Sequence, residues 1–220
     1  MRYERKFVLK NQKEYIGFIK LMKLTEFDFN EIHNERIINN LYFDNDNSDS
    51  LFQNFNGEFK KLKIRLRWYN NENIYRLELK EKSGGFGSKK KIKVLINSGV
   101  EIINYPDKVQ NSTLRLEDII MITNETYLLR KLRLVSYNSY KRKYLFNKKL
   151  NIRITIDSSL FFKNLRIGNI SFHKPYKIIE LKYEANKNFE DKYAFLVKNF
   201  NSDLTKFSKF SNSSYNFKYY

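Results

Sequence analysis

The sequence predicts a mainly β protein of the α+β class, in which an antiparallel sheet is flanked by a few helices. Several stretches alternate apolar residues with charged ones, and this period of two is typical of strands. Their polar positions are mostly Arg, Lys and Glu, whereas ordinary sheets also place Thr, Ser and Asn there. No fixed-period repeat and no linker divides the 220 residues, so we expect a single domain over residues 1–220.

The clearest of these stretches is Lys61–Tyr69, which reads K-L-K-I-R-L-R-W-Y. Its apolar residues, ending with Trp68, share one face and need a packed partner. Close like charges on the other face repel by on the order of 4 kcal/mol at about 4 Å and a dielectric near 20. That face is therefore either solvated or turned toward a polyanion, and it carries Lys61, Lys63, Arg65, Arg67 and Tyr69.

The remaining elements follow from the same patterns, taken in chain order. Asn11 can cap a helix that we expect to run to about Leu24, and Ser48 opens a short helical turn that Gly57 ends. Helical structure is also expected over much of 97–132 and over 189–200. Strands are expected at 3–9, 35–44, 61–69, 74–82, 89–96, 136–146, 151–157 and 177–184.

Composition limits the functional class. The net charge of +18 favours an anionic partner. The absence of Cys removes disulfides, thiolate chemistry and Cys-type zinc sites. No apolar run is long enough to span a bilayer and no secretory signal is evident, so we expect a cytoplasmic chain with no transmembrane segment.

Several common catalytic motifs are absent. No P-loop occurs, and Gly84-Gly85-Phe86-Gly87 lacks the Rossmann spacing and is most simply a hairpin turn. The two His residues, His33 and His173, do not form a zinc-binding motif or a catalytic triad. Nucleophilic catalysis is therefore not expected.

Three strands instead carry a Glu and a Lys two residues apart, which places a carboxylate and an ammonium on one face. Such pairs form either a surface ion-pair lattice or a set of hard oxygen ligands for Mg²⁺ or Mn²⁺ beside phosphate-binding cations. The pairs are Glu4/Lys6, Glu78/Lys80 and Glu180/Lys182. A closed antiparallel barrel could turn these charged faces inward to line a tunnel or outward to solvent, and the pattern alone leaves both open.

The order of short motifs resembles the VTC-type polyphosphate polymerase domain, a member of the triphosphate tunnel metalloenzymes in the CYTH-like superfamily. The resemblance covers essentially the whole chain, and each motif is weak alone whereas their order is specific. The motifs are Glu4-Arg5-Lys6-Phe7, Leu41–Asn45, Lys63–Tyr69, Leu77–Lys80, Tyr140–Arg142, Arg153–Asp157, Glu180–Lys182 and Lys206–Phe210. The resemblance implies a closed barrel of eight antiparallel strands around a basic tunnel, with flanking helices.

The resemblance also implies a set of site residues. The cations expected to act in catalysis are Arg65, Arg67, Lys80, Arg142, Arg153 and Lys182. Those expected to bind substrate are Lys6, Lys63, Tyr140, Lys206, Ser208 and Lys209. The carboxylates expected to bind Mn²⁺ or Mg²⁺ are Glu180, from the resemblance, and Glu78 and Glu4, from the Glu/Lys pairs.

The implied activity is metal-dependent transfer of the γ-phosphoryl group of ATP to a growing inorganic polyphosphate chain. The acceptor phosphate is already ionised at neutral pH, since its second pKa is about 6, so no protein general base is required. One alternative is a tri- or polyphosphate hydrolase in which Glu78 or Glu4 activates water. Two further alternatives are a non-catalytic polyphosphate-binding domain and a nucleic-acid-binding protein. We expect ATP and polyphosphate, and not nucleic acid, as partners. The sequence identifies no partner subunit.

Overall fold

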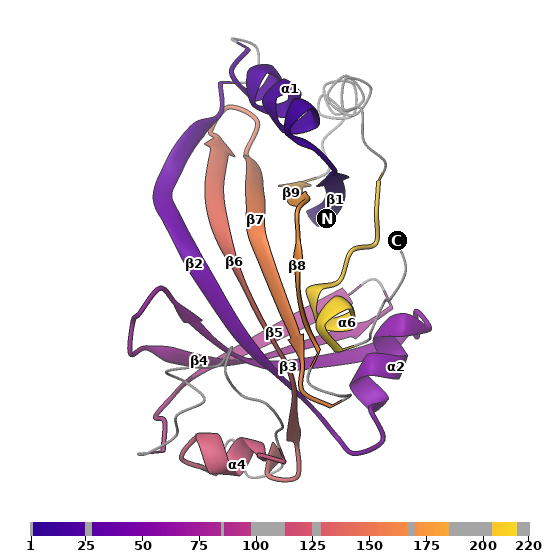
Figure 1. Ribbon diagram of the computed structural model, residues 1–220. Coiled ribbons are helices and arrows are strands. Elements are labelled where there is room, and N and C mark those ends of the chain that lie inside the picture. Colours follow the sequence, from indigo (N-terminus) through magenta and orange to yellow (C-terminus); the bar gives the residue numbers. More distant parts are fainter. Residues whose placement is uncertain are drawn as a thin grey trace. The chain divides into compact units, whose positions relative to one another are not determined.

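The structure is a computed structural model that describes residues 2–24, 28–84, 86–97, 113–124, 129–166, 170–184 and 204–214. Antiparallel strands dominate it (Figure 1), which confirms the mainly β prediction. The strands are β1 (Arg2–Leu9), β2 (Asn30–Asp44), β3 (Lys60–Tyr69), β4 (Tyr75–Ser83), β5 (Phe86–Val94), β6 (Arg133–Asn147), β7 (Ile152–Asn164), β8 (Ser171–Lys174) and β9 (Lys177–Glu184). The helices are α1 (Gln12–Met22), α2 (Asp49–Phe55), α4 (Leu116–Ile119) and α6 (Lys209–Ser214). No helix in the described ranges is long and apolar enough to cross a membrane.

The strands pair in the order β1-β9-β7-β6-β2-β3-β4-β5, with β8 paired to β7. The expected closed barrel of eight strands is not confirmed: the described residues form a nine-stranded sheet whose pairing order is open. The additional strand is β8, a four-residue segment too short for alternation to reveal it.

The chain groups into two compact units, which are described in turn. The first unit comprises Met1–Ile37, Tyr140–Leu160 and His173–Phe207. The second comprises Ile38–Ser139, Phe161–Phe172 and Ser208–Tyr220. The long strands β2, β6 and β7 contribute residues to both units.

The first unit is built on β1, which pairs with β9, and on β9, which pairs with β7. Its alternating apolar positions form a buried core with one face of α1, through Phe18 and Met22. Asn11 caps α1 as expected: its side-chain oxygen accepts a hydrogen bond of 2.9 Å from the Glu14 backbone N–H. The Glu14 carboxylate in turn accepts one of 2.7 Å from the Lys10 N–H, so both polar groups at this helix start are paired.

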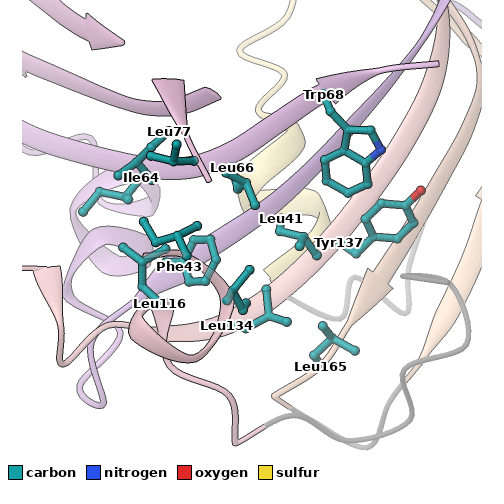
Figure 2. Packing of buried hydrophobic residues seen from close by; sticks show 13 residues of the cluster. Leu41, Phe43, Ile64, Leu66, Trp68, Leu77, Leu116, Leu134, Tyr137 and Leu165 are labelled. Carbon is teal, nitrogen blue, oxygen red and sulfur yellow. The ribbon is translucent and has the colours of Figure 1, made fainter. Parts of the chain in front are cut away.

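The second unit is built on β3, which pairs with β2 and β4, while β5 pairs with β4 and lies beside it (Figure 1). The apolar face of β3 faces a core formed with β2, β6 and α4 (Figure 2). Trp68 is 4% exposed, and its ring lies 5.8 Å from that of Tyr75 and 6.4 Å from that of Tyr137. Trp68 is therefore a packing residue, and it offers no platform for stacking on a base.

Some element bounds differ from the expected ones. β7 continues past Asp157 to Asn164, because the run Asp157-Ser158-Ser159 interrupts the apolar alternation in the sequence without ending the strand; Ser159 adopts a left-handed conformation (φ 51°). In the described parts of 97–132, the helix is limited to α4, and the flanking residues form isolated bridges such as Ile96↔Ile120. The helix expected at 189–200 lies outside the described residues.

Candidate functional site

The second unit carries an array of cations on the face of β3 opposite its core. Cross-strand register extends this array over β4 and β5, because residues directly opposite each other point to the same face. The rows are Lys63–Lys80–Lys89, Arg65–Glu78–Lys91 and Arg67–Arg76–Lys93. The structure thus brings four of the predicted cations together in one unit: Lys63, Arg65, Arg67 and Lys80.

Glu78 lies at the centre of this array and is 2% exposed. Its Oε2 accepts hydrogen bonds from Arg65 Nε at 2.8 Å and Arg65 Nη2 at 2.6 Å. Its Oε1 lies 2.7 Å from Lys89 Nζ, and Arg67 Nη1 lies 3.8 Å from Oε2. Both carboxylate oxygens are therefore paired with cations.

These contacts alter two pKa values. Burial alone would raise the pKa of Glu78, but the charges of Arg65, Arg67 and Lys89 outweigh it and lower the pKa to about 2. The pKa of Lys89 is lowered to about 8, by burial first and then by the two nearby guanidinium groups, and Glu78 offsets only part of this. The carboxylate is thus fully ionised at neutral pH, while Lys89 titrates near physiological pH.

Polar residues of β2 and β6 orient Arg67 from its other side. Arg67 Nε donates to Asn40 Oδ1 at 2.8 Å, and Asn40 Nδ2 donates to Asn138 Oδ1 at 2.9 Å. Both asparagines are fully buried. Tyr42 likewise accepts a hydrogen bond of 3.2 Å from Arg65 Nη1. The two arginines of the R-x-R motif are therefore oriented by neighbouring strands.

The predicted C-terminal motif is divided between the two units. In the second unit, Ser208 Oγ accepts a hydrogen bond of 3.1 Å from Lys63 Nζ, and Lys209 is the first residue of α6. In the first unit, Lys206 is exposed on an extended segment that is bonded to β1. There Thr205 N donates to Lys6 O at 2.9 Å, and Lys6 Nζ donates to Phe207 O at 3.1 Å.

The first unit carries a second charged cluster, in which two of the predicted Glu/Lys pairs meet. Register places Lys6 opposite Glu180 and Glu4 opposite Lys182. Lys6 Nζ lies 3.1 Å from Glu4 and 3.9 Å from Glu180, and Lys182 forms ion pairs with the same two carboxylates. Although burial lowers it, the pKa of Lys6 is raised overall by Glu180 and Glu4. Lys6 therefore stays charged, and both lysines lie between the same two carboxylates.

Arg142 forms a bidentate ion pair with Asp157 in the same unit, with distances of 2.6 and 2.7 Å. Asp157 is fully buried, and Arg142 also lies 5.2 Å from the centre of the Tyr140 ring. Burial opposes its charge, but Asp157 and Tyr140 raise the pKa of Arg142 well above its ordinary value. Arg142 and Tyr140, both predicted site residues, are therefore fixed in place by Asp157 and by each other.

Arg153 is an exposed cation of the first unit, and register places it opposite Lys182. A polar pocket of about 60 Å³ lies here, lined by Asn151, Arg153, Lys182, Tyr183 and Glu184. The first unit therefore offers a small concave surface with two of the predicted cations at its wall.

The fit of a divalent metal differs between the two clusters. Glu4 and Glu180 supply hard oxygen donors, with side chains 36% and 10% exposed, of the kind with which Mg²⁺ or Mn²⁺ is held together with substrate phosphates. No group of three or more His, Cys, Asp or Glu residues is present in the part of the chain that the structure describes. Glu78 fits less well, because its side chain is only 2% exposed and Arg65 and Lys89 lie 2.6 and 2.7 Å from its two oxygens.

Sequence reasoning did not select Lys89, Asp157, Tyr42 and Asn40, which contact predicted residues, or Asn138, which bonds to Asn40. Alternation does carry a signal for two of them. Lys89 lies in a basic strand, and Asp157 shares the face of Arg153. The other three belong to β2 and β6, and their role depends on the pairing of these strands.

Comparison with solved structures shows the same fold in other proteins. A candidate adenylate cyclase from Bacillus halodurans is 16% identical, with a TM-score of 0.51 and 94% of each chain covered. One from Vibrio parahaemolyticus is 11% identical, with a TM-score of 0.50 and 94% of each chain covered. A candidate adenylyl cyclase from Hippeastrum, described as having a dominant triphosphatase activity, is 15% identical, with a TM-score of 0.50. The match covers 96% of this chain and 94% of that chain. The sequence matches none of the curated proteins.

The sequence itself matches the model of a protein family. The match extends over residues 1–217 and includes both charged clusters. It agrees with the resemblance that the sequence suggested over essentially the whole chain. The chain belongs to the VTC domain family.

Proposed function

We propose that this protein is a polyphosphate polymerase, which transfers the γ-phosphoryl group of ATP to the end of an inorganic polyphosphate chain and releases ADP. The observation that carries the proposal is the cationic array on β3, β4 and β5, within a chain of the VTC domain family. The proposal includes the closed barrel around a basic tunnel that the resemblance implies, in which the polyphosphate chain would lie.

The array suits a substrate with repeated negative charges. Its rows continue along the strands, where successive side chains of one face are about 7 Å apart. Planar guanidinium groups such as those of Arg65 and Arg67 bind phosphate oxygens with two hydrogen bonds, whereas the lysines act as point charges. A chain of phosphates can therefore contact several rows at once.

The proposed catalytic contribution is electrostatic. Phosphoryl transfer spreads negative charge over the transferring and leaving oxygens, and fixed cations stabilise that charge without reorganising. In the second unit this role falls to Arg65, Arg67 and Lys80, and in the first to Arg142, Arg153 and Lys182. The acceptor is an ionised phosphate, so no residue has to remove a proton from it.

Glu4 and Glu180 are the residues that would hold Mn²⁺ or Mg²⁺. When bound, the metal neutralises phosphate charge next to Lys6 and Lys182. The ion pairs of these lysines hold the two carboxylates on one face of adjacent strands.

A tri- or polyphosphate hydrolase is the second candidate. It is supported by the Hippeastrum protein of the same fold, which is described as having triphosphatase activity. A hydrolase needs a group that orients or deprotonates water. The pKa of Glu78, about 2, makes it a weak proton acceptor, so Glu4 is the better candidate for this role.

The test is to incubate the purified protein with ATP and Mn²⁺ and to analyse the phosphate products. An acid-insoluble polymer that stains with a polyphosphate dye supports the polymerase. Orthophosphate without polymer contradicts it and supports the hydrolase. Binding of tripolyphosphate with no product of either kind indicates a non-catalytic binding domain.

A further inference from the structure

Glu78 is the carboxylate of the cationic face formed by β3, β4 and β5. The other charged residues that the register places on this face among the described ones are Lys and Arg. Glu78 is 2% exposed, and both of its oxygens contact cations at hydrogen-bond distance. Burying a charge is costly unless it is paired, so the buried carboxylate of Glu78 depends on these cations.

Two ordinary roles do not match these contacts. A metal ligand would place a divalent cation against Arg65 and Lys89, which already lie 2.6 and 2.7 Å from the carboxylate oxygens. A general base would need an accessible oxygen, whereas Glu78 is almost fully buried. The remaining role is that of an anion placed among cations that bind anions.

The contacts also have an orienting geometry. Arg65 uses its Nε and one Nη nitrogen on Glu78 Oε2, and its other Nη donates to Tyr42 at 3.2 Å. Lys89 approaches the opposite oxygen, so Glu78 holds cations from β3 and β5 around one point of β4. Without the carboxylate, these cations would repel one another.

We propose that Glu78 is a positioning residue: an internal counter-anion that holds Arg65, Arg67 and Lys89 in place for phosphate and offsets part of their charge. The proposal rests on the proposed function and deepens it. Glu78 acts through the cations, and it lowers the affinity for phosphate so that product can leave.

Glu78→Gln tests the proposal, because the amide keeps the shape of the side chain and removes its charge. We expect tripolyphosphate to bind about tenfold more tightly, since a carboxylate within contact distance no longer competes for the cations. We also expect kcat to fall together with KM, because Arg65 is less firmly oriented and product is held longer. Isothermal titration with tripolyphosphate and steady-state kinetics with ATP measure the two effects.

Glu81→Gln is the matched control. Glu81 belongs to the same strand and is exposed, and register places it opposite Leu62 rather than opposite a cation. The substitution changes net charge equally, so we expect affinity and kinetics close to those of the wild type. Equal tightening in both variants would contradict the proposal, because it would reflect net charge alone.

The alternatives predict different results for Glu78→Gln. A metal ligand would raise the Mn²⁺ concentration required for activity, and a purely structural residue would weaken binding. If the variant unfolds in buffer, tripolyphosphate should restore its fold and raise its unfolding temperature more than that of the wild type; failure to do so contradicts the proposal. If the wild type itself does not bind tripolyphosphate, the proposed function fails rather than this inference.

Discussion

Arg65 serves both the fold and the proposed site. Its guanidinium donates two hydrogen bonds to Glu78, whose side chain is 2% exposed. From the sequence alone, a row of like charges suggests that removing one would relieve repulsion. The structure shows instead that this row contains its own anion, so removing Arg65 leaves a buried carboxylate with fewer partners.

Arg65→Ala is therefore expected to affect activity and stability together. We predict a loss of about 10²–10³ in kcat, as for the loss of one oriented donor to a transition state. The free energy of unfolding should fall by about 1–3 kcal/mol, because Arg67 and Lys89 still pair with Glu78. Polymer formation and urea unfolding measure the two effects.

Lys90→Ala is the charge-matched control for this prediction. Lys90 is exposed, and register places it opposite Leu79 on the other face of the sheet. It should retain activity and stability near those of the wild type. A comparable loss of activity in both variants would argue against a specific role for this face.

Lys89 makes stability depend on pH in a defined direction. Its pKa is about 8 in the folded protein against an ordinary 10.5, so between these values the unfolded state binds more protons. The free energy of unfolding should therefore rise as the pH increases above about 8. Below pH 8, Lys89 is charged in both states, and the full cost of burying its charge lowers the stability of the folded protein. Urea unfolding from pH 7 to 9 measures this rise, and Lys89→Gln should flatten it. A slope identical in the two proteins would contradict the assignment.

The extended segment from Leu204 to Phe207 is bonded to strand β1. This segment forms an isolated bridge with Phe7, and Lys6 bonds to it through both its backbone oxygen and its side chain. The side chain of Lys6 also contacts Glu4 and Glu180. The first unit therefore connects its charged cluster to the first residues of the C-terminal motif.

Lys6→Met should loosen this segment while leaving β1 in the sheet. The substitution removes the hydrogen bond to Phe207 O, whereas the backbone bond from Thr205 is kept. We expect trypsin to cleave after Lys206 several-fold faster, because local opening governs cleavage of an exposed site. Lys10→Met, at the residue after β1, is the control and should be cleaved at the wild-type rate. Unchanged cleavage in Lys6→Met would show that the backbone contacts hold the segment alone.

At the scale of the whole molecule, each unit carries a charged face: the cationic array on β3, β4 and β5 in one, and the cluster of Glu4, Lys6, Glu180 and Lys182 in the other. In our proposal, Lys and Arg side chains of the protein bind the phosphates directly. Glu4 and Glu180 act only when they hold a divalent metal ion. Binding and turnover should therefore respond differently to metal removal.

We predict that EDTA abolishes polymer formation but leaves tripolyphosphate binding measurable. At a hundredfold excess over its Kd, tripolyphosphate should still stabilise the fold by about 2.7 kcal/mol. Thermal unfolding with and without EDTA tests this. Single-stranded RNA should compete less well than tripolyphosphate, and stronger competition by RNA would favour the nucleic-acid-binding alternative.

Much of the fold could be predicted from local patterns. Alternation located strands at Tyr3–Leu9, Lys61–Tyr69 and Lys177–Glu184, and the cap at Asn11 was read from one residue type. The prediction was weakest where the pattern is interrupted, as at Ser159, or where a strand is short, as in β8. Closure of the barrel could not be tested by alternation, because a period of two identifies faces and not neighbours.

The sequence by itself determined which side chains share a face, since that depends only on the alternation within each strand. It also carried the resemblance to the VTC domain, which the family match confirms. Only the tertiary structure decided that Glu78 pairs with Arg65 and Lys89, and that Asp157 pairs with Arg142. These partners lie on different strands, and only the register of pairing brings them within hydrogen-bond distance.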